Sequence, residues 1–391
     1  SIPLLNPEFS NPLFLKLFCE GLNKKGLTRI PDGYEGITNI IKFFIEGIEE
    51  KLLKKYPNIK SLGLINKTIK VLIPKILENQ TITYEDSLST IIKEVTSKWG
   101  IAPEFLDDLI VEGLFIKNIF YKHDTKEHEE GIYFAYERFE DHLKVNYFFD
   151  NFFDKENPKK SFKKKPLATY FERKNPSFNL VVIDAMFIQL PERASFELID
   201  VVEQNEEIID SFLNSLVWRK VDSITPNVVD RIVKNINNEH FQEDIYKILF
   251  STASNPQHPL NANLLFDYLS KFTMKDRDVF LIPLLNSIYI NYETNPIKRL
   301  IDWAWSDEDK SYISDDSIFL TSITLSWLLT SSNRQLRDHA TKALISLLQN
   351  RVTVVLSLLK KFENINEPYI YERLLAVSLG VVIRLENYTY L

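Results

Sequence analysis

Residues 133–149 decide the fold, and they read YFAYERFEDHLKVNYFF. Aromatic side chains crowd both faces of the segment Tyr133–Tyr136, as is typical of an extended strand. From there on, apolar or aromatic residues recur at steps of four, at Phe139, Leu143 and Tyr147, which is the spacing of one helical face. The sequence therefore predicts a short strand that runs directly into a helix.

The chain before this stretch begins with a helical domain, predicted over residues 1–80. Its first helix starts near Pro12, where proline is tolerated because the N–H that it lacks would have no partner in a first helical turn. A second helix is predicted over Ile37–Tyr56, and a third carries the apolar residues between Ile65 and Ile76.

Residues 81–165 predict a winged-helix domain. Thr83 can cap one helix, and Pro103 can open a second. Two predicted strands follow, Phe115–Tyr121 and Ile132–Tyr136. Two helices followed by a small β-hairpin are the element order of a winged helix.

A polar loop, His123–Gly131, is predicted between these two strands. Its sequence is mostly acidic, so a DNA backbone would be repelled, which favours an interaction or regulatory use of the domain. Four side chains of the loop have metal-ligand chemistry, His123, Asp124, His128 and Glu129. A solvated hairpin tip is the favoured interpretation, and we predict no metal site.

A lysine cluster lies between prolines in residues 154–166, which read DKENPKKSFKKKP. Blocks of like charge usually stay hydrated, so a solvated basic linker is the first interpretation. The alternative is that the lysines within 159–165 contact an acidic partner or a nucleic acid. Phe162 is the only aromatic residue inside the cluster, so the sequence gives only weak support for base stacking.

Residues 166–391 predict a helical-repeat domain. Apolar helices alternate with short polar breaks, and two late units align at a spacing of 34 residues, one from Arg334 and one from Pro368. A single helical hairpin cannot bury its apolar face, so such units must stack on their neighbours. We therefore expect an α-solenoid of HEAT- or TPR-like hairpins.

Several side chains of this region have two interpretations, as structural or as binding residues. We predict Phe212 and Trp218 to be core residues and not contact residues. We predict Arg334, Arg337 and Asp338 to form salt bridges between repeats and not to bind a ligand.

The composition of the 391 residues favours a mainly helical protein. Ten glycines are few for this length, whereas nucleotide-cradling and all-β folds depend on glycine turns. The net charge of −7 argues against nucleic acid as a partner. The single cysteine, Cys19, excludes an intramolecular disulfide and fits the reducing cytoplasm. No apolar run approaches the roughly 20 residues of a membrane span, so no membrane contact is predicted.

Two absences concern catalysis. The sequence has no glycine-rich loop ending in lysine and serine or threonine, which would cradle phosphates and Mg²⁺, and no Walker B carboxylate run. We therefore expect this segment itself not to be catalytic. The residues after Ser1 resemble the middle of a domain, so we expect the chain to be a segment of a longer protein.

The opening stretch resembles a motif of NACHT-type STAND ATPases. In that family a run of phenylalanine–x–histidine–x–threonine–phenylalanine–glutamine–glutamate reports on bound nucleotide at a strand end. Phe134, Phe139, Asp141 and Leu143 match the run, whereas Tyr136 stands where the family usually has histidine.

A second stretch, residues 6–22, resembles the segment that follows the nucleotide-binding core in the same family. It reads NPEFSNPLFLKLFCEGL, and Pro12 and Leu13 match the proline and leucine of the family's glycine–x–proline–leucine motif. Three further stretches resemble bacterial antiviral STAND proteins of the AVAST type: IDAMFIQLPER (183–193), SFLNSLVWR (211–219) and SSNRQLRDHATKALISLL (331–348).

The resemblance implies the regulatory and sensor portion of a cytoplasmic STAND ATPase, with residues 1–80 as a remnant of its helical lid domain and residues 166–391 as a truncated sensor domain. Its repeats would recognise a phage protein, and it would control nucleotide-dependent homo-oligomerisation in antiviral defence. Pro12 would contact adenine, and Tyr136 and Arg138 would face the phosphates and stabilise the ADP-bound resting state. The cofactor, ATP or ADP with Mg²⁺, would belong to the parent protein's own upstream ATPase core and not to this segment alone.

The alternative is a helical-repeat scaffold for protein–protein interaction without nucleotide linkage. Both motifs would then be coincidental packing patterns. A P-loop in the sequence upstream of Ser1 would favour the STAND interpretation over this one.

Overall fold

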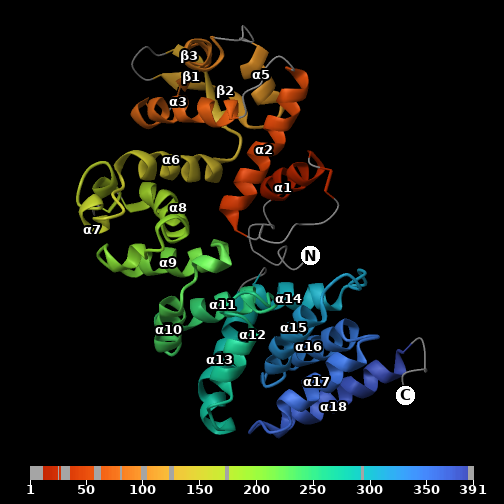
Figure 1. Cartoon of the computed structure of the whole chain (residues 1–391). Coiled ribbons are helices and arrows are strands. Elements are labelled where there is room, and N and C mark those ends of the chain that lie inside the picture. Colours follow the sequence, from red (N-terminus) through yellow and green to blue (C-terminus); the bar gives the residue numbers. More distant parts are fainter. Residues whose placement is uncertain are drawn as a thin grey trace. The chain divides into compact units, whose positions relative to one another are not determined.

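The computed structural model describes residues 12–24, 26–27, 36–56, 63–79, 82–97, 104–122, 127–171, 176–291 and 295–385. These residues are mainly helical and include one small three-stranded antiparallel sheet (Figure 1). The chain divides into two compact units, one that ends at Ser223 and one that continues from Ile224.

Three helices open the N-terminal unit: α1 (Pro12–Lys24), α2 (Ile37–Lys55) and α3 (Leu64–Asn79). The second begins at the predicted residue, and its buried positions, such as Ile37, Ile41 and Phe44, follow helical spacing. Glu49 of α2 is buried and accepts the backbone N–H groups of Gly63, Leu64 and Ile65 at 2.8–3.1 Å. Its carboxylate therefore satisfies the otherwise unpaired first turn of α3.

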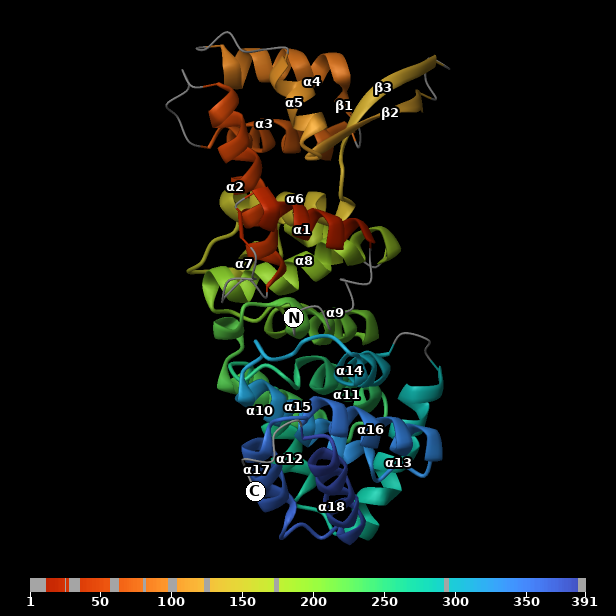
Figure 2. The ribbon, with the colours of Figure 1, turned by 90° about the vertical axis from the view of Figure 1, so that its right-hand side faces the viewer.

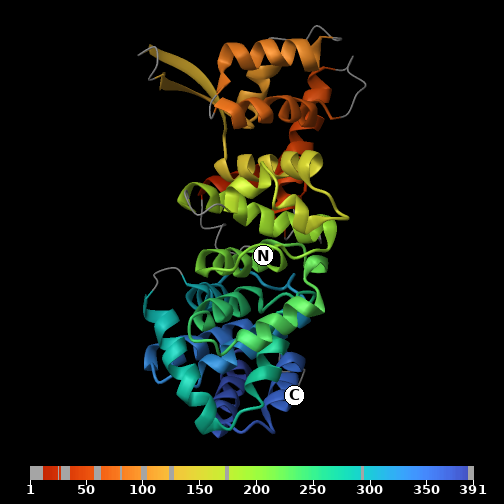
Figure 3. The ribbon, with the colours of Figure 1, turned by 90° about the vertical axis from the view of Figure 1, so that its left-hand side faces the viewer.

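The sheet and its two helices come next, as β1 (Ile82–Thr83), α4 (Tyr84–Ile91), α5 (Glu104–Val111), β2 (Phe115–Lys122) and β3 (Glu127–Phe134). A π-helical turn, Ile92–Thr96, extends α4. Thr83 caps α4 as predicted, since its hydroxyl accepts the Asp86 N–H at 3.0 Å. The strand order is β1-β3-β2, and β2 and β3 project away from α3, α4 and α5 (Figures 2 and 3).

The prediction for the sheet was wrong in two respects. The residues Glu127–Gly131, predicted as loop, belong to β3, and the two-residue strand β1 was not predicted. Cross-strand contacts hold the acidic segment in the sheet, because Lys117 of β2 pairs with Glu130 at 2.6 Å. Gly131 lies under the ring of Phe120, where an added Cβ would come within 2.7 Å of a ring carbon.

The rest of the N-terminal unit is made of α6 (Glu137–Phe152), α7 (Pro158–Ser161), α8 (Pro176–Ala194) and α9 (Glu206–Trp218), with short 3-10 turns at Leu167–Phe171, Leu198–Asp200 and Val221–Ser223. The predicted passage from strand to helix is confirmed, since β3 ends at Phe134 and α6 begins at Glu137. Helix α8 packs on α6 and on α9 (Figure 1).

The lysine cluster is not a simple linker. Phe162 is only 6% exposed, and its ring contacts those of Phe149, Phe153 and Phe171, with centroids 5.8–6.5 Å apart. Its phenyl ring is therefore buried in an aromatic cluster and is not displayed for base stacking. The neighbouring side chains of Lys163, Lys164 and Lys165 are exposed.

The C-terminal unit contains α10 (Pro226–Asn235), α11 (Gln242–Thr252), α12 (Ala262–Leu269), α13 (Met274–Asn291), α14 (Pro296–Trp305), α15 (Asp315–Leu328), α16 (Arg334–Leu347), α17 (Val352–Phe362) and α18 (Pro368–Ile383). Every described element after residue 200 in the sequence is a helix or a turn, as predicted. The two units that align at 34 residues, α16 and α18, pack directly on each other.

Helix contacts in this unit form two rows. Helices α11, α14, α16 and α18 contact one another in that order, and α12, α15 and α17 do the same. Helix α15 joins the rows, because it also packs on α16. All of its side chains from Ser317 to Leu328 are buried except that of Phe319, which is partly exposed. Its hydroxyl groups bond the carbonyl four residues earlier, as in Thr321 to Ser317 at 2.8 Å.

The charges at the start of α16 do not form salt bridges between repeats. Arg334 pairs with Asp338 at 3.5 Å within the same helix. Arg337 donates to the carbonyl of Ser331 at 2.6 Å, and its guanidinium lies 6.0 Å from the ring centroid of Tyr369 in α18. The prediction was wrong because i,i+4 spacing satisfies the pair locally.

A buried ion pair links distant parts of the C-terminal unit instead. Arg277 of α13, fully buried, pairs with Glu367 at 2.9 Å and donates to the carbonyl of Asn366 at 2.7 Å. Glu367 directly precedes α18, so this pair fixes where that helix starts. Within the described residues, no helix combines the length and apolar character that a membrane crossing requires.

Candidate functional site at the start of α6

The corner between β3 and α6 carries Tyr136 and Arg138, the two residues that the sequence resemblance predicts to face a nucleotide. Tyr136 is the residue before the helix, in extended conformation, and its side chain is buried. Its ring packs edge-on against Phe139, with centroids 4.9 Å apart, and Phe139 packs in turn on Phe44 of α2. Burial raises the pKa of Tyr136 to about 12, so its hydroxyl stays protonated at neutral pH.

Arg138 is partly exposed and links three helices. Its guanidinium lies 5.3 Å from the ring centroid of Trp218 at the end of α9, close enough for a cation–π contact. Burial lowers the pKa of Arg138, and the negative charges of Asp184 on α8 and Asp141 on α6 oppose that shift. Ser211 of α9 hydrogen-bonds the Asp184 carboxylate. Arg138 is therefore held among carboxylates and is not sealed in an apolar core.

Trp218 and Phe212 are both buried, as predicted for core residues. Trp218 nevertheless also forms one wall of the Arg138 environment. Its position follows from the contact of α9 with α8, which in turn packs on α6.

Asp141 and His142 follow Arg138 on α6 and are both buried. Burial raises the pKa of Asp141 to about 6, and the ammonium of Lys144, 3.9 Å from its carboxylate, opposes this shift. Burial lowers the pKa of His142 to about 3, and the charge of Arg138 acts in the same direction. His142 is therefore neutral at physiological pH.

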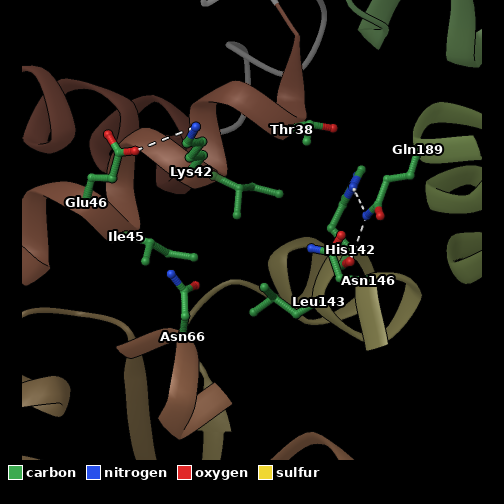
Figure 4. Close-up of a pocket in the computed structure, with 10 residues that line it drawn as sticks. Thr38, Lys42, Ile45, Glu46, Asn66, His142, Leu143, Asn146 and Gln189 are labelled. Carbon is green, nitrogen blue, oxygen red and sulfur yellow. Dashed lines mark hydrogen bonds and ion pairs between the residues drawn. The ribbon is translucent and has the colours of Figure 1, made fainter. Parts of the chain in front are cut away.

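The hydrogen bonds of Gln189 on α8 fix the tautomer of His142 (Figure 4). The Gln189 Nε2 atom donates to the His142 carbonyl oxygen at 2.7 Å and lies 3.1 Å from His142 Nδ1. A carbonyl oxygen can only accept, so the Gln189 atom facing it must be the amide nitrogen. Nδ1 is then the acceptor, and the ring proton is on Nε2.

This arrangement leaves one donor and one acceptor buried without a partner. His142 is 2% exposed and Gln189 1% exposed, and neither His142 Nε2 nor Gln189 Oε1 has a hydrogen bond. Buried polar atoms are nearly always paired, so the pair lowers stability relative to a fully bonded cluster. Both residues also line a neighbouring hollow that has polar walls.

A hollow of about 310 Å³ adjoins the cluster, between α2, α3, α6 and α8 (Figure 4). Its apolar walls come from Ile41, Ile45 and Leu143. Its polar lining residues are Thr38, Lys42, Glu46, Asn66, His142, Asn146 and Gln189. Lys42 and Glu46 face each other at 3.9 Å. These residues can hold water or a small polar molecule, but they contain no paired nucleophile and base.

The structure brings Tyr136 and Arg138 together but does not test their relation to Pro12. Pro12 is the first residue of α1, and its side chain, like that of Leu13, lies outside the described residues. Helix α1 packs on α2, which contacts α6 through Phe44 and Phe139.

Sequence reasoning missed Asp184 and Gln189, the two polar residues of α8 in this cluster. A signal was available, because both interrupt the otherwise apolar run VVIDAMFIQL at 181–190. A carboxylate or amide inside such a run must find a buried partner. The sequence does not say which partner, since Gln189 meets His142 across 47 residues.

Metal chemistry finds no support in the part of the chain that the structure describes, where no group of three or more His, Cys, Asp or Glu side chains is placed to hold an ion. Two of the side chains considered for the hairpin tip, His123 and Asp124, lie outside that part. No protein-family model, no curated protein and no solved structure matches this chain.

Proposed function

We propose that this chain is the regulatory and sensor portion of a STAND-type ATPase that recognises a phage protein and controls nucleotide-dependent oligomerisation. The observation that carries the proposal is the order α3–β1–α4–α5–β2–β3 with strand order β1-β3-β2. Such an order is typical of a winged helix, the domain that the sequence resemblance predicts between its two motifs.

The environment of Arg138 supports a role in the resting state. A guanidinium presents planar donors that suit phosphate oxygens, and this one is partly exposed at the corner where the resemblance places the nucleotide. Asp184 and Asp141 hold it charged and in position. The adenine nucleotide and Mg²⁺ would be held by an upstream core. This chain would contribute Pro12 against the adenine, and Tyr136 and the cation of Arg138 facing the phosphates.

A surface of the C-terminal unit supports a role in recognition. Trp305 at the end of α14 is 38% exposed, and its ring lies 5.4 Å from that of His339 in α16. The ammonium of Lys342 lies 4.9 Å from the Trp305 ring centroid. Exposed tryptophan is enriched among residues that dominate protein–protein binding. We infer that the foreign protein contacts α14 and α16 around Trp305.

The test is to purify the protein from its intact coding sequence and to measure bound ADP. The variant Arg138→Ala should lose ADP at least tenfold faster and should be active without a phage trigger. Arg138→Lys keeps the charge but not the planar fork, and should be intermediate. The matched control is Arg193→Ala, which removes an exposed arginine that pairs with Asp150 on the same pair of helices.

One observation favours the second candidate, a helical-repeat scaffold without nucleotide linkage. Tyr136 is buried against Phe139, and Arg138 lies over Trp218, so both residues also serve to pack β3, α6 and α9 together. An intact protein that contains no bound nucleotide, and in which Arg138→Ala lowers only the melting temperature, would select the scaffold.

A further inference from the structure

The hollow beside His142 and Gln189 lies within the N-terminal unit, between α2, α3, α6 and α8. Its volume of about 310 Å³ is enough for a small organic molecule. His142 and Gln189 form part of its wall, and Figure 4 shows the two side chains next to each other there. The hollow is therefore bounded by two side chains that each keep a buried polar atom without a hydrogen bond.

These two atoms set the hydrogen-bonding chemistry of a ligand. The Nε2–H group of His142 can only donate, and the Oε1 atom of Gln189 can only accept. The Nδ1 atom of the same imidazole lies 3.1 Å from Gln189 Nε2, so the two side chains are in contact and one small molecule can reach both. A primary carboxamide matches them, because its carbonyl oxygen accepts from the imidazole and its N–H group donates to the Gln189 oxygen.

The other lining residues favour a neutral ligand with an aliphatic part. The charged ones, Lys42 and Glu46, already face each other at 3.9 Å, and their side chains are 73% and 42% exposed. A charged ligand would find no further counter-charge among the lining residues, and burying an unpaired charge is costly. Ile41, Ile45 and Leu143 provide apolar walls. Of the described lining residues, none is phenylalanine, tyrosine or tryptophan, so a flat base has no such ring to stack on.

We propose that this hollow is a binding site for a small neutral carboxamide that carries an aliphatic group. The amide bonds His142 Nε2–H and Gln189 Oε1, and the aliphatic group lies against Ile41, Ile45 and Leu143. Both polar atoms are closed to solvent, so binding requires their side chains to shift toward the hollow, as side chains at binding sites commonly do. A bound molecule also stabilises the packing of α2, α3, α6 and α8, because all four helices line the hollow.

The test is saturation-transfer NMR of the chain with isobutyramide as the probe and isobutyrate as its charged counterpart. So small a ligand binds weakly, and we expect a dissociation constant on the order of 1 mM. Isobutyrate has a carboxylate in place of the amide, so it has no N–H group for Gln189 and brings a charge into the hollow. We expect it to bind at least about tenfold more weakly.

A side chain that fills the hollow tests the location. Asn66 of α3 lines the hollow and is exposed, so Asn66→Trp should keep the fold and abolish isobutyramide binding. The matched control is Lys67→Trp, at the next exposed residue of α3, which is not among the lining residues and points about 100° away around the helix. This control should bind isobutyramide like the unmodified chain.

Removal of the imidazole donor tests the chemistry. His142→Asn keeps an acceptor for Gln189 but has no Nε2–H group, and it should weaken isobutyramide binding about tenfold. Circular dichroism checks that each variant is folded. The proposal is overturned if the unmodified chain does not bind isobutyramide, if isobutyrate binds equally well, or if binding survives Asn66→Trp. A folded His142→Asn variant that binds as tightly as the unmodified chain also overturns it.

Discussion

At the scale of single residues, the central feature is a set of ionisable side chains whose pKa values are displaced by burial. Asp141 and His142 are adjacent on α6, yet burial raises the pKa of one to about 6 and lowers that of the other to about 3. Both shifts favour the neutral form, as desolvation requires. Their effects on stability have opposite signs as the pH falls.

The His142 shift predicts a loss of stability in acid. Below pH about 6.5 the unfolded chain binds a proton at this imidazole, whereas the folded chain does not until the pH approaches about 3. Between pH 6.5 and 5 this costs roughly 2 kcal/mol. Asp141 acts oppositely, since its folded form binds a proton between pH about 6 and its unfolded pKa near 4, and so gains stability as the pH falls.

The two contributions are separated by His142→Asn, whose Oδ1 can replace Nδ1 as the acceptor for Gln189. We expect the variant to be less stable at pH 7, but to lose about 2 kcal/mol less than the unmodified chain between pH 7 and 5. Urea unfolding at several pH values measures this. Parallel curves for the two proteins would mean that folding does not lower the pKa of His142.

At the scale of elements, the helices were predictable and the short or charged segments were not. The start of α2 and the Thr83 cap of α4 follow from local periodicity and capping chemistry. Strand β1 has only two residues, which is too short for an alternating apolar pattern to be recognised. The acidic part of β3 has the composition of a loop because its outer face is solvated. Tyr136 and Arg138 were predicted as site residues from a local motif, and that prediction stays untested.

The rest of the site depends on tertiary contacts. Asp184 and Gln189 of α8 interact with Arg138 and His142 of α6. The two helices are too far apart in the sequence for a local pattern to indicate these contacts. The same holds for Glu49, which satisfies the start of α3 from the preceding helix. Such partners can be expected from a buried polar residue in an apolar run, but they cannot be assigned without the packing of the helices.

The burial of Phe162 predicts that one aromatic ring keeps the lysine cluster ordered. Phe162→Ala should reduce stability by about 3 kcal/mol, because it leaves a cavity among Phe149, Phe153 and Phe171. Trypsin cleavage after Lys163 or Lys164 should then be faster by at least tenfold. Phe152→Ala, at an exposed phenylalanine on the same helix as Phe149, is the control. Equal cleavage rates for the two variants would contradict this role of Phe162.

At the scale of the whole molecule, the chain combines a sheet-bearing unit with a unit whose described elements are helices and turns. We predict that the isolated chain does not hydrolyse ATP, because its sequence has no loop to cradle the β- and γ-phosphates and no acidic Mg²⁺ ligand run. Phosphate release with MgATP measures this. Turnover that saturates with ATP concentration would contradict the assignment of the chain as a regulatory portion.

Helix α15 sets how the C-terminal unit can come apart. Linear arrays commonly fray one hairpin at a time, because each helix keeps a face that water can tolerate. From Ser317 to Leu328 every side chain of this helix is buried except the partly exposed Phe319, and its hydroxyl groups hydrogen-bond its own backbone. Loss of the helices that pack on it, in its own row or in the row of α16, would expose most of its side chains to water at once. The unit should therefore melt in a single all-or-none step. Amide hydrogen exchange should be slow in α12, α15 and α16 and should proceed at the same rate in all three helices.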